Sequence, residues 1–311
     1  MAVYFLNLKT FGRSNGSSAV SAAAYRAGER IRDERSGKTY DHSNRQDVMH
    51  KEIIVPSQFT AEDMAWAKDR ANLWNTAEGA ESRRNARVAR EYLVALPVEL
   101  SAQQRLGLVR GFSQELSDRY RFAVDVAIHA PRDFPGSDAR NFHAHLLATT
   151  REVVTDGLGA KTTLEWNDRN RREAGLAPAI NELLHVRARW ATVTNEALQE
   201  AHLDARIDHR TLQAQGIDRE PGLYIPRVAF EMERHGYRSI VAERLRDEHQ
   251  ARLDARSERT AGQDAPAVGK AQSLEEIRRE ARESWLRMRS AQAEPAPMAV
   301  GERTRDDDLE R

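Results

Sequence analysis

The sequence predicts an α/β sandwich in which helices flank a largely antiparallel central sheet. Helical and strand-like segments are intermixed along the 311 residues, without the strict strand–helix–strand alternation that is typical of parallel sheets. Hydrophobic residues make up 40% and charged residues 31% of the chain, as in a globular protein that carries a polar extension. The sequence contains no internal repeat and no phosphate-binding glycine loop. We therefore expect one main domain followed by a tail.

The first two elements are expected to be a strand and a helix. Residues 2–11 place apolar side chains on both faces of a strand, which indicates a buried position in the sheet. A turn, RSNGSS, follows the strand. Either Ser17 or Ser18 is suited to cap a helix over 19–34, with Tyr25 in its middle, because this alanine-rich stretch contains no proline.

The next part of the chain is expected to alternate again between strand and helix. The stretch 36–44 has the composition of a loop or hairpin, and the run 48–56 predicts a strand that ends at its proline. From 61 to about 90 the apolar residues follow a helical period. The following segment, EYLVALP, predicts a strand.

The second half of the main domain begins with a helix over 101–120, which leads into the strand-like runs 122–129 and 141–150. The connection between these two runs is rich in proline, glycine and aspartate, which favours a loop longer than a tight hairpin. Strand patterns fall away after Arg151, and a long helix is expected over 179–198.

Three regions are expected along the chain. Residues 1–235 form the main domain, and residues 236–290 form a highly charged helical extension with a linker, AGQDAPAVGKAQ. Within this extension, a helix is expected from about Ser273 to Ala291. Residues 291–311 lack enough apolar side chains to pack, so we expect a disordered tail.

Composition excludes several classes of protein and site. There is no run of 18 or more apolar residues and no signal peptide pattern, so we expect a protein of the cytoplasm. The chain has no cysteine, which excludes disulfides, thiolate metal ligands and cysteine nucleophiles. The formal net charge is zero and argues neither for nor against nucleic acid as a partner.

Three histidines on neighbouring strands are the most informative chemical feature. His143 and His145 are two residues apart, so they project from the same face of one strand, and His129 closes the strand before it. Imidazole suits divalent transition metals, and three protein ligands with the remaining positions open are typical of a catalytic metal site. Spacing alone does not distinguish a hydrolase from other metal enzymes.

Two groups of arginines are candidates for contacts with phosphates. Runs of this kind are also common on solvated helix faces, and nothing in either group specifies a base sequence. The first group recurs at helical spacing and consists of Arg83, Arg84, Arg87 and Arg90. The second is a local cluster of Arg169, Arg171 and Arg172.

Four segments, in order along the chain, resemble the MobA/MobL family of conjugative relaxases. They are SSAVSAAAYRAGERIRDERSGKTYDH, ARVAREYLVALPVEL, the His-x-His strand and RIDHRTLQAQGIDREP. Four separated motifs in one order are more specific than any one of them, and together they lie within residues 1–235. The resemblance implies the two-layer HUH endonuclease fold and a site-specific, single-strand DNA nicking enzyme that acts at a plasmid transfer origin.

The resemblance also implies roles for individual residues. Tyr25 matches the family's nucleophile, and His129, His143 and His145 match its ligands for a divalent metal, Mg²⁺ or Mn²⁺. Glu91 matches an acidic position with three open roles: a hydrogen bond to a ligand histidine, contact with the metal, or deprotonation of the tyrosine. The chain departs from the family's pattern in a longer connection before His143. Candidate DNA contacts are Arg26, Arg83, Arg84, Arg87, Arg90 and Arg210.

These residues suit transesterification. A phosphodiester is an anion that repels nucleophiles, and a bound metal ion withdraws charge from it and favours a phenolate nearby. Attack by Tyr25 then joins its oxygen to the 5′ phosphate, and the retained bond energy allows a 3′ hydroxyl to reseal the strand later. Expected partners are single-stranded or hairpin DNA at the transfer origin, relaxosome accessory proteins and the coupling protein of type IV secretion, and the protein is expected to travel with the DNA into the recipient cell.

Three other interpretations remain open from the sequence. The chain could be a DNA-binding accessory protein or inactive remnant that recognises a transfer origin without cutting it. It could be a replication initiator or transposase with the same chemistry. It could also be a metallohydrolase in which the histidines activate water and Tyr25 has no chemical role.

Overall fold

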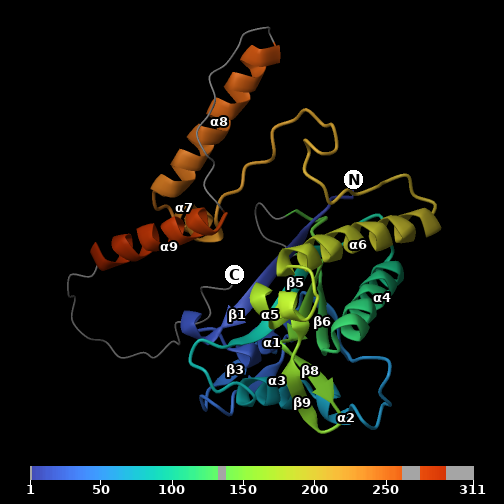
Figure 1. Ribbon diagram of the computed structural model, residues 1–311. Helices are drawn as coiled ribbons and strands as arrows, with labels where there is room; N and C mark the ends of the chain where they lie inside the picture. The colour runs from blue at the N-terminus through green and yellow to red at the C-terminus, as the bar shows by residue number, and fades with distance from the viewer. Residues whose placement is uncertain (1, 132–137, 261–273, 292–311) are drawn as a thin grey trace. The chain divides into compact units, whose positions relative to one another are not determined.

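The computed structural model describes residues 2–131, 138–260 and 274–291 (Figure 1). Contacts between Cα atoms divide the chain into two compact units, Met1–Arg210 and Thr211–Arg311. The predicted linker and the predicted disordered tail lie outside the described residues.

The first unit is built on a five-stranded sheet with the order β1-β5-β7-β6-β4. Every neighbouring pair in this sheet is antiparallel, which confirms the predicted fold class. The strands are β1 (Leu6–Gly12), β4 (Val48–Ile54), β5 (Arg87–Ala95), β6 (Val124–His129) and β7 (His143–Thr149). The sheet places β6 and β7, the two histidine-bearing strands, side by side near its centre.

Helices cover both faces of this sheet. On one face, α4 (Ala102–Tyr120) and α6 (Ala179–Glu200) pack over Val94, Val126 and Leu146. On the other face, the apolar residues of α1 (Ala19–Ala27), α2 (Ala65–Lys68) and α3 (Arg70–Gly79) pack with a second set of strand residues that includes Leu147. Burial of these apolar side chains is the main stabilising term of the unit.

The alternation of side chains along β7 decides where the histidines lie. Leu146 belongs to the core under α4 and α6, whereas Leu147 belongs to the core under α1 and α3. His143 and His145 differ from Leu147 by even numbers of residues, so they share its face. The histidines therefore lie on the α1 face of the sheet.

The helix predicted over 19–34 is shorter in the structure. Ser18 caps α1, and the helix ends at Gly28, which has a left-handed φ of 60°. A short hairpin follows, in which β2 (Arg30–Arg32) pairs with β3 (Thr39–Asp41). The prediction of a longer helix was wrong because Gly28 can adopt the left-handed conformation that ends helices. Tyr25 consequently lies in the last turn of α1 and not in its middle.

The first strand is also less buried than predicted. It starts at Leu6 and occupies an edge of the sheet, and two apolar side chains before it, Val3 and Phe5, are 69% and 45% exposed. Apolar residues on both faces of a strand therefore did not indicate a central position here.

The helix predicted over 61–90 divides into α2 and α3 and stops at Gly79. Strand β5 begins at Arg87, so the helical spacing assigned to Arg83, Arg84, Arg87 and Arg90 was wrong. Arg90 lies on a strand because β5 pairs with β1 and β7, and Arg83 lies in the loop before that strand. This pairing joins residues that are distant in the chain, so the spacing of apolar residues within one segment cannot predict it.

A second correction concerns the region after Arg151, where strands were not expected. The structure has a hairpin there, in which β8 (Arg151–Val154) pairs with β9 (Gly157–Lys161). Both strands are short, which explains why their alternation was missed. By contrast, the predicted helix after Ser101 is confirmed, and Ser101 and Gln104 form a reciprocal capping box at its start.

The remaining elements of the first unit are short. They are the 3₁₀ helices η1 (Arg13–Asn15) and η2 (Thr163–Glu165) and the helix α5 (Asp168–Glu173). The second unit contains α7 (Arg227–Arg234), α8 (Ile240–Thr260) and α9 (Leu274–Ala291), which share a small apolar core. None of the described helices combines the length and apolar character that a membrane span requires.

Candidate metal and nucleophile site

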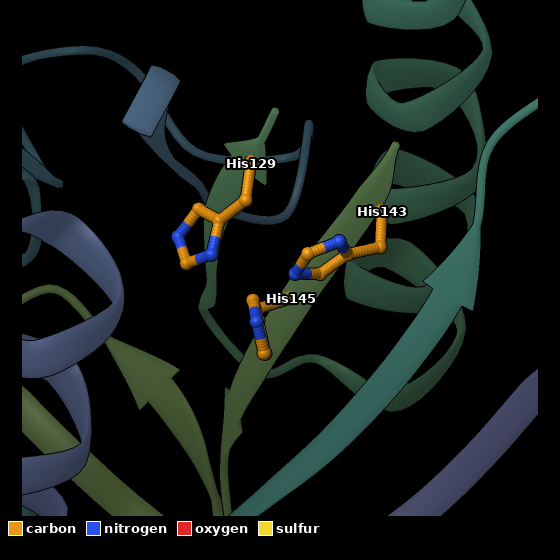
Figure 2. Close-up of side chains that lie close together, drawn as sticks. All are labelled: His129, His143 and His145. Atoms are coloured by element: carbon orange, nitrogen blue, oxygen red, sulfur yellow. The ribbon is translucent and has the colours of Figure 1, made fainter. Parts of the chain in front are cut away.

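Two neighbouring strands bring the three predicted ligands together. In the register of the sheet, His129 of β6 lies opposite His143 of β7, and His145 follows two residues later on the same face. One ligand nitrogen from each of the three rings lies within 4.8 Å of the other two. Figure 2 shows the three rings converging from the two strands. This geometry is what a facial metal site with three imidazole ligands requires.

Each ring has one nitrogen held by an acceptor outside the trio. Nδ1 of His145 lies 2.6 Å from Oε1 of Glu91, and Nδ1 of His143 lies 3.0 Å from the carbonyl oxygen of Asn141. Nε2 of His129 lies 2.7 Å from the carbonyl oxygen of Arg26. An N–H must point at each of these acceptors, so the opposite nitrogen of each ring carries the lone pair that a metal ion needs. For His129 this nitrogen is Nδ1, whose lone pair also faces the guanidinium of Arg45, with Nη2 at 3.3 Å.

The site keeps the imidazoles of His129 and His145 neutral. Burial, together with the nearby His145, lowers the pKa of His129 to about 3. Burial also lowers the pKa of His145 to about 4, although Glu91 acts in the opposite direction. Neutral imidazole is the form that binds metal ions, and the residues present therefore fit a divalent cation.

Glu91 joins the triad to helix α1. Its carboxylate accepts hydrogen bonds from His145 and from the guanidinium of Arg26, whose Nη2 lies 3.0 Å from Oε2. Both side chains of this ion pair are buried, with 7% and 4% exposed for Arg26 and Glu91. Burial disfavours ionisation of Glu91, but Arg26 and His145 outweigh this effect and hold its pKa well below the usual range. Glu91 is therefore an ionised acceptor that orients His145.

Tyr25 lies next to the same cluster. It directly precedes Arg26, whose carbonyl accepts the hydrogen bond from His129. Arg45 connects the two sides, since its Nη1 donates to the carbonyl oxygen of Tyr25 at 2.8 Å and its Nη2 lies 3.3 Å from Nδ1 of His129. The structure thus brings the predicted nucleophile and the predicted ligands to one end of the sheet.

The arginines proposed as DNA contacts do not form one surface. Arg26 and Arg90 are buried, and Arg90 pairs with Glu165 at 2.7 Å. Arg83 and Arg84 are exposed in the loop before β5, Arg87 is 53% exposed and pairs with Glu165, and Arg210 pairs with Asp208.

Arg87 also lies far from His143 along the sheet. Ala95, at the far end of β5, pairs with His143, and Arg87 lies eight residues earlier on that strand. At about 3.4 Å per residue, this separation is roughly 27 Å. Arg87, and the loop with Arg83 and Arg84 that leads into its end of β5, therefore lie away from the end of the strand that faces His143.

Three residues around the site were missed by sequence reasoning. Arg45, Asp47 and His42 all lie in the polar segment between β3 and β4 and approach Tyr25 or each other. A polar loop after a hairpin has no period or motif that distinguishes such residues, so the sequence offered no signal for them. Phe142, the residue before His143, lies under the guanidinium of Arg105, whose central carbon is 4.0 Å from the ring centroid.

Comparison with known proteins gives consistent relatives. The MobA/MobL family model matches residues 17–235. The mobilization protein MobL of Acidithiobacillus ferridurans is 37% identical over 253 residues, which cover 75% of this chain and 64% of that protein. Mobilization protein A of Escherichia coli is 34% identical over 253 residues, or 78% of this chain and 32% of that protein. The chain thus spans less than two thirds of the length of these relatives.

A solved structure, described as the molecular basis of vancomycin resistance transfer in Staphylococcus aureus, has 27% sequence identity and a TM-score of 0.53. The alignment covers 68% of this chain and 100% of that chain. The sheet with paired histidines on a central strand is the HUH endonuclease fold expected from the resemblance. Because the family model matches well over half of its residues, the chain belongs to the MobA/MobL family.

Proposed function

We propose that this chain is a plasmid mobilisation relaxase that nicks one DNA strand at a transfer origin through Tyr25. The observation that carries this proposal is the junction between α1 and the triad: the carbonyl of Arg26, next to Tyr25 in the chain, accepts a hydrogen bond from His129. A nucleophile-bearing helix turn is thereby fixed to a ligand of the proposed metal site. Membership of a family whose members include mobilization proteins supports the same function.

His129, His143 and His145 would hold a divalent ion, which we propose to be Mg²⁺ or Mn²⁺. When bound, such an ion acts as a Lewis acid on a non-bridging oxygen of the scissile phosphate. Three neutral imidazoles suit this purpose because they leave the charge of the ion undiminished, whereas carboxylate ligands would cancel part of it.

The reaction of the chain's own residues is a transesterification. The Oη atom of Tyr25 loses its proton and forms a bond to phosphorus, while the bond from phosphorus to the 3′ oxygen breaks and that oxygen leaves as a hydroxyl. The product is a 5′ phosphotyrosyl link, and attack by a 3′ hydroxyl reverses the step and rejoins the strand. Of the three roles considered for Glu91, its contacts support the hydrogen bond to a ligand histidine, His145.

The DNA strand near the cut is proposed to cross the open sheet surface beside the triad. The carbonyl oxygen of Phe5 accepts a hydrogen bond from the N–H of Ala95, and Ala95 lies opposite His143 in the sheet. The three residues therefore lie side by side across the strands, with their side chains on the same face. Phe5 is 45% exposed, and its ring offers a surface on which a base can stack. Arg83, Arg84, Arg87 and Arg210 are proposed to contact DNA further from the cut.

Other partners follow from the same proposal. Relaxosome accessory proteins and the coupling protein of a type IV secretion system would act with a relaxase of this kind. We place its action in the cytoplasm, before transfer with the bound DNA.

A nicking assay tests the proposal. Supercoiled plasmid carrying the DNA that flanks this gene is incubated with the protein and Mg²⁺ or Mn²⁺, then treated with detergent and protease. We expect relaxed circles from the wild type and from Tyr40→Phe, a control tyrosine in the neighbouring hairpin, but none from Tyr25→Phe. Nicking by Tyr25→Phe at the wild-type rate would overturn the proposal and favour a hydrolase, and binding without any nicking by the wild type would favour a DNA-binding accessory protein.

A further inference from the structure

Arg45 contacts both halves of the proposed active site. Its guanidinium carbon lies 4.2 Å from the centroid of the Tyr25 ring, within the range of a cation–π contact. The same guanidinium donates to the carbonyl oxygen of Tyr25 at 2.8 Å and lies 3.3 Å from Nδ1 of His129. Only 9% of the Arg45 side chain is exposed, so solvent screens these interactions weakly.

The orientation of this guanidinium is fixed by Asp47. Nε and Nη2 of Arg45 donate to the two carboxylate oxygens of Asp47 at 2.8 and 2.5 Å, which makes a bidentate pair. The backbone of Asp47 is itself anchored, since its carbonyl oxygen accepts a hydrogen bond at 2.8 Å from the N–H of Ala130, the residue after His129. The segment that carries Arg45 is therefore tied to the end of the ligand strand.

The Tyr25 ring is also contacted by a second side chain of this segment. The ring of His42 lies 5.2 Å from the ring of Tyr25, centroid to centroid, at an interplanar angle of 87°. This edge-on contact differs from the cation–π contact of Arg45, which needs the face of the ring. Together the two contacts restrict rotation of the phenol about its χ1 and χ2 angles.

We propose that Arg45 is a positioning residue that holds the Tyr25 ring in a fixed orientation relative to His129. This inference rests on the proposed function, because it matters for chemistry only if Tyr25 is the nucleophile. Arginine suits the task because its planar fork presents a cationic face to the ring and N–H groups in several directions within one plane. Lysine carries the same charge but cannot make the bidentate pair, the carbonyl contact and the ring contact together.

Arg70 is a matched control. Its side chain is 9% exposed, like that of Arg45, and it makes an equivalent bidentate pair with Asp125. Its guanidinium bonds to Asp125 and Glu29 and, within the described residues, to neither Tyr25 nor the three histidines. Substitution of Arg70 therefore reports the cost of losing a buried arginine ion pair without disturbing the nucleophile directly.

The experiment compares Arg45→Lys and Arg45→Gln with Arg70→Lys. Single-turnover cleavage of a saturating single-stranded oligonucleotide that spans the mapped cut, and the dissociation constant of that oligonucleotide, separate chemistry from binding. A third measurement uses the metal-free protein: ring ¹³C–¹H NMR signals of tyrosine, with Tyr25 assigned by its loss in Tyr25→Phe. This signal reports the ring environment without requiring cleavage.

We expect both Arg45 variants to cleave about a hundred-fold more slowly, the loss associated with misplacing a reacting group by about 1 Å, with the dissociation constant unchanged. The Tyr25 signals should move in both variants and stay in place in Arg70→Lys. Wild-type cleavage rates with unmoved Tyr25 signals would overturn the inference, as would weaker DNA binding at an unchanged cleavage rate. A wild type that never cleaves would instead overturn the proposed function, while the NMR signals would still test the contact between Arg45 and Tyr25.

Discussion

The carboxylate of Glu91 offers a sharp test of how the site is held together. The perturbation is Glu91→Gln, which keeps the size of the side chain and removes its charge. Oε1 of Glu91 lies 2.6 Å from Nδ1 of His145, and both carboxylate oxygens accept from Arg26. Since Glu91 is 3% exposed, water cannot replace these partners. The substitution should therefore weaken metal binding and lower the stability of the fold.

The magnitude follows from the number and type of these contacts. Loss of a carboxylate that orients a ligand histidine typically lowers metal affinity by about 10- to 100-fold. This range corresponds to about 1.4–2.8 kcal/mol of binding free energy. Hydrogen bonds to a charged group contribute about 1.5–3 kcal/mol to the free energy of unfolding, so the metal-free variant should also be less stable. In a unit of this size, the expected fall in Tm is about 2–4 °C for each kcal/mol.

Titration calorimetry with Mn²⁺ measures the first effect, and thermal unfolding of the metal-free protein measures the second. Glu165→Gln is a matched control, because Glu165 is a buried carboxylate that accepts from Arg90 at 3.0 and 2.7 Å. It should lose a comparable amount of stability while keeping the wild-type affinity for Mn²⁺.

Wild-type Mn²⁺ affinity in Glu91→Gln, together with the expected loss of stability, would refute the reasoning. It would mean that Glu91 holds helix α1 to the sheet through Arg26 without affecting the ligand set. Equal losses of affinity in Glu91→Gln and Glu165→Gln would refute it too, since a general weakening of the fold would then explain both.

Three further predictions concern the metal, the DNA and the fold. Removal of metal by a chelator should stop plasmid nicking, and addition of Mn²⁺ should restore it; nicking that persists in excess chelator would contradict the metal site. Phe5→Ala should weaken binding of single-stranded oligonucleotide by about 1–3 kcal/mol, the contribution of one stacked base, whereas Val154→Ala, at another exposed apolar side chain, should leave binding unchanged in a fluorescence anisotropy titration. Gly28→Ala should lower the free energy of unfolding more than Gly37→Ala does in urea denaturation. Both glycines have a left-handed φ, but a Cβ atom at Gly28 would meet Cγ2 of Val48 at 3.2 Å and at Gly37 nothing within 4 Å; equal losses would show that this contact has no effect.

The sequence predicted the α/β class, the helices α4 and α6 and the strands of the histidines, because each of these has a regular apolar period along its whole length. The prediction that His129, His143 and His145 converge also follows from a local rule, the two-residue repeat of a strand, combined with the pairing of consecutive strands. What failed were the ends of helices, including the helix predicted over 61–90, which stops at Gly79, and short elements. The end of α1 at Gly28 and the hairpin of β8 and β9 each depend on a few residues, so no period marks them.

The environment of Tyr25 lay beyond sequence reasoning for a different reason. Arg26 was expected to contact DNA, but the structure directs its guanidinium inward to Glu91, which is 65 residues away in the chain. Arg45 reaches Tyr25 and His129 from a polar loop. Such contacts are set by the packing of α1 against the sheet, and the charge of an arginine does not indicate whether it will face solvent or a buried carboxylate.

The central claim is that Tyr25 becomes joined to DNA, and mass spectrometry of the cleavage product tests it most directly. Single-stranded oligonucleotide containing the transfer origin is reacted with the protein and Mn²⁺, the complex is digested with nuclease and trypsin, and peptides that carry a nucleotide are sequenced. Trypsin should release the peptide from Ser14 to Arg26, because it cleaves after Arg13 and Arg26. We predict a 5′ phosphonucleotide on Tyr25 in this peptide. Cleaved DNA with no attached peptide, or an adduct on another residue, would contradict the account.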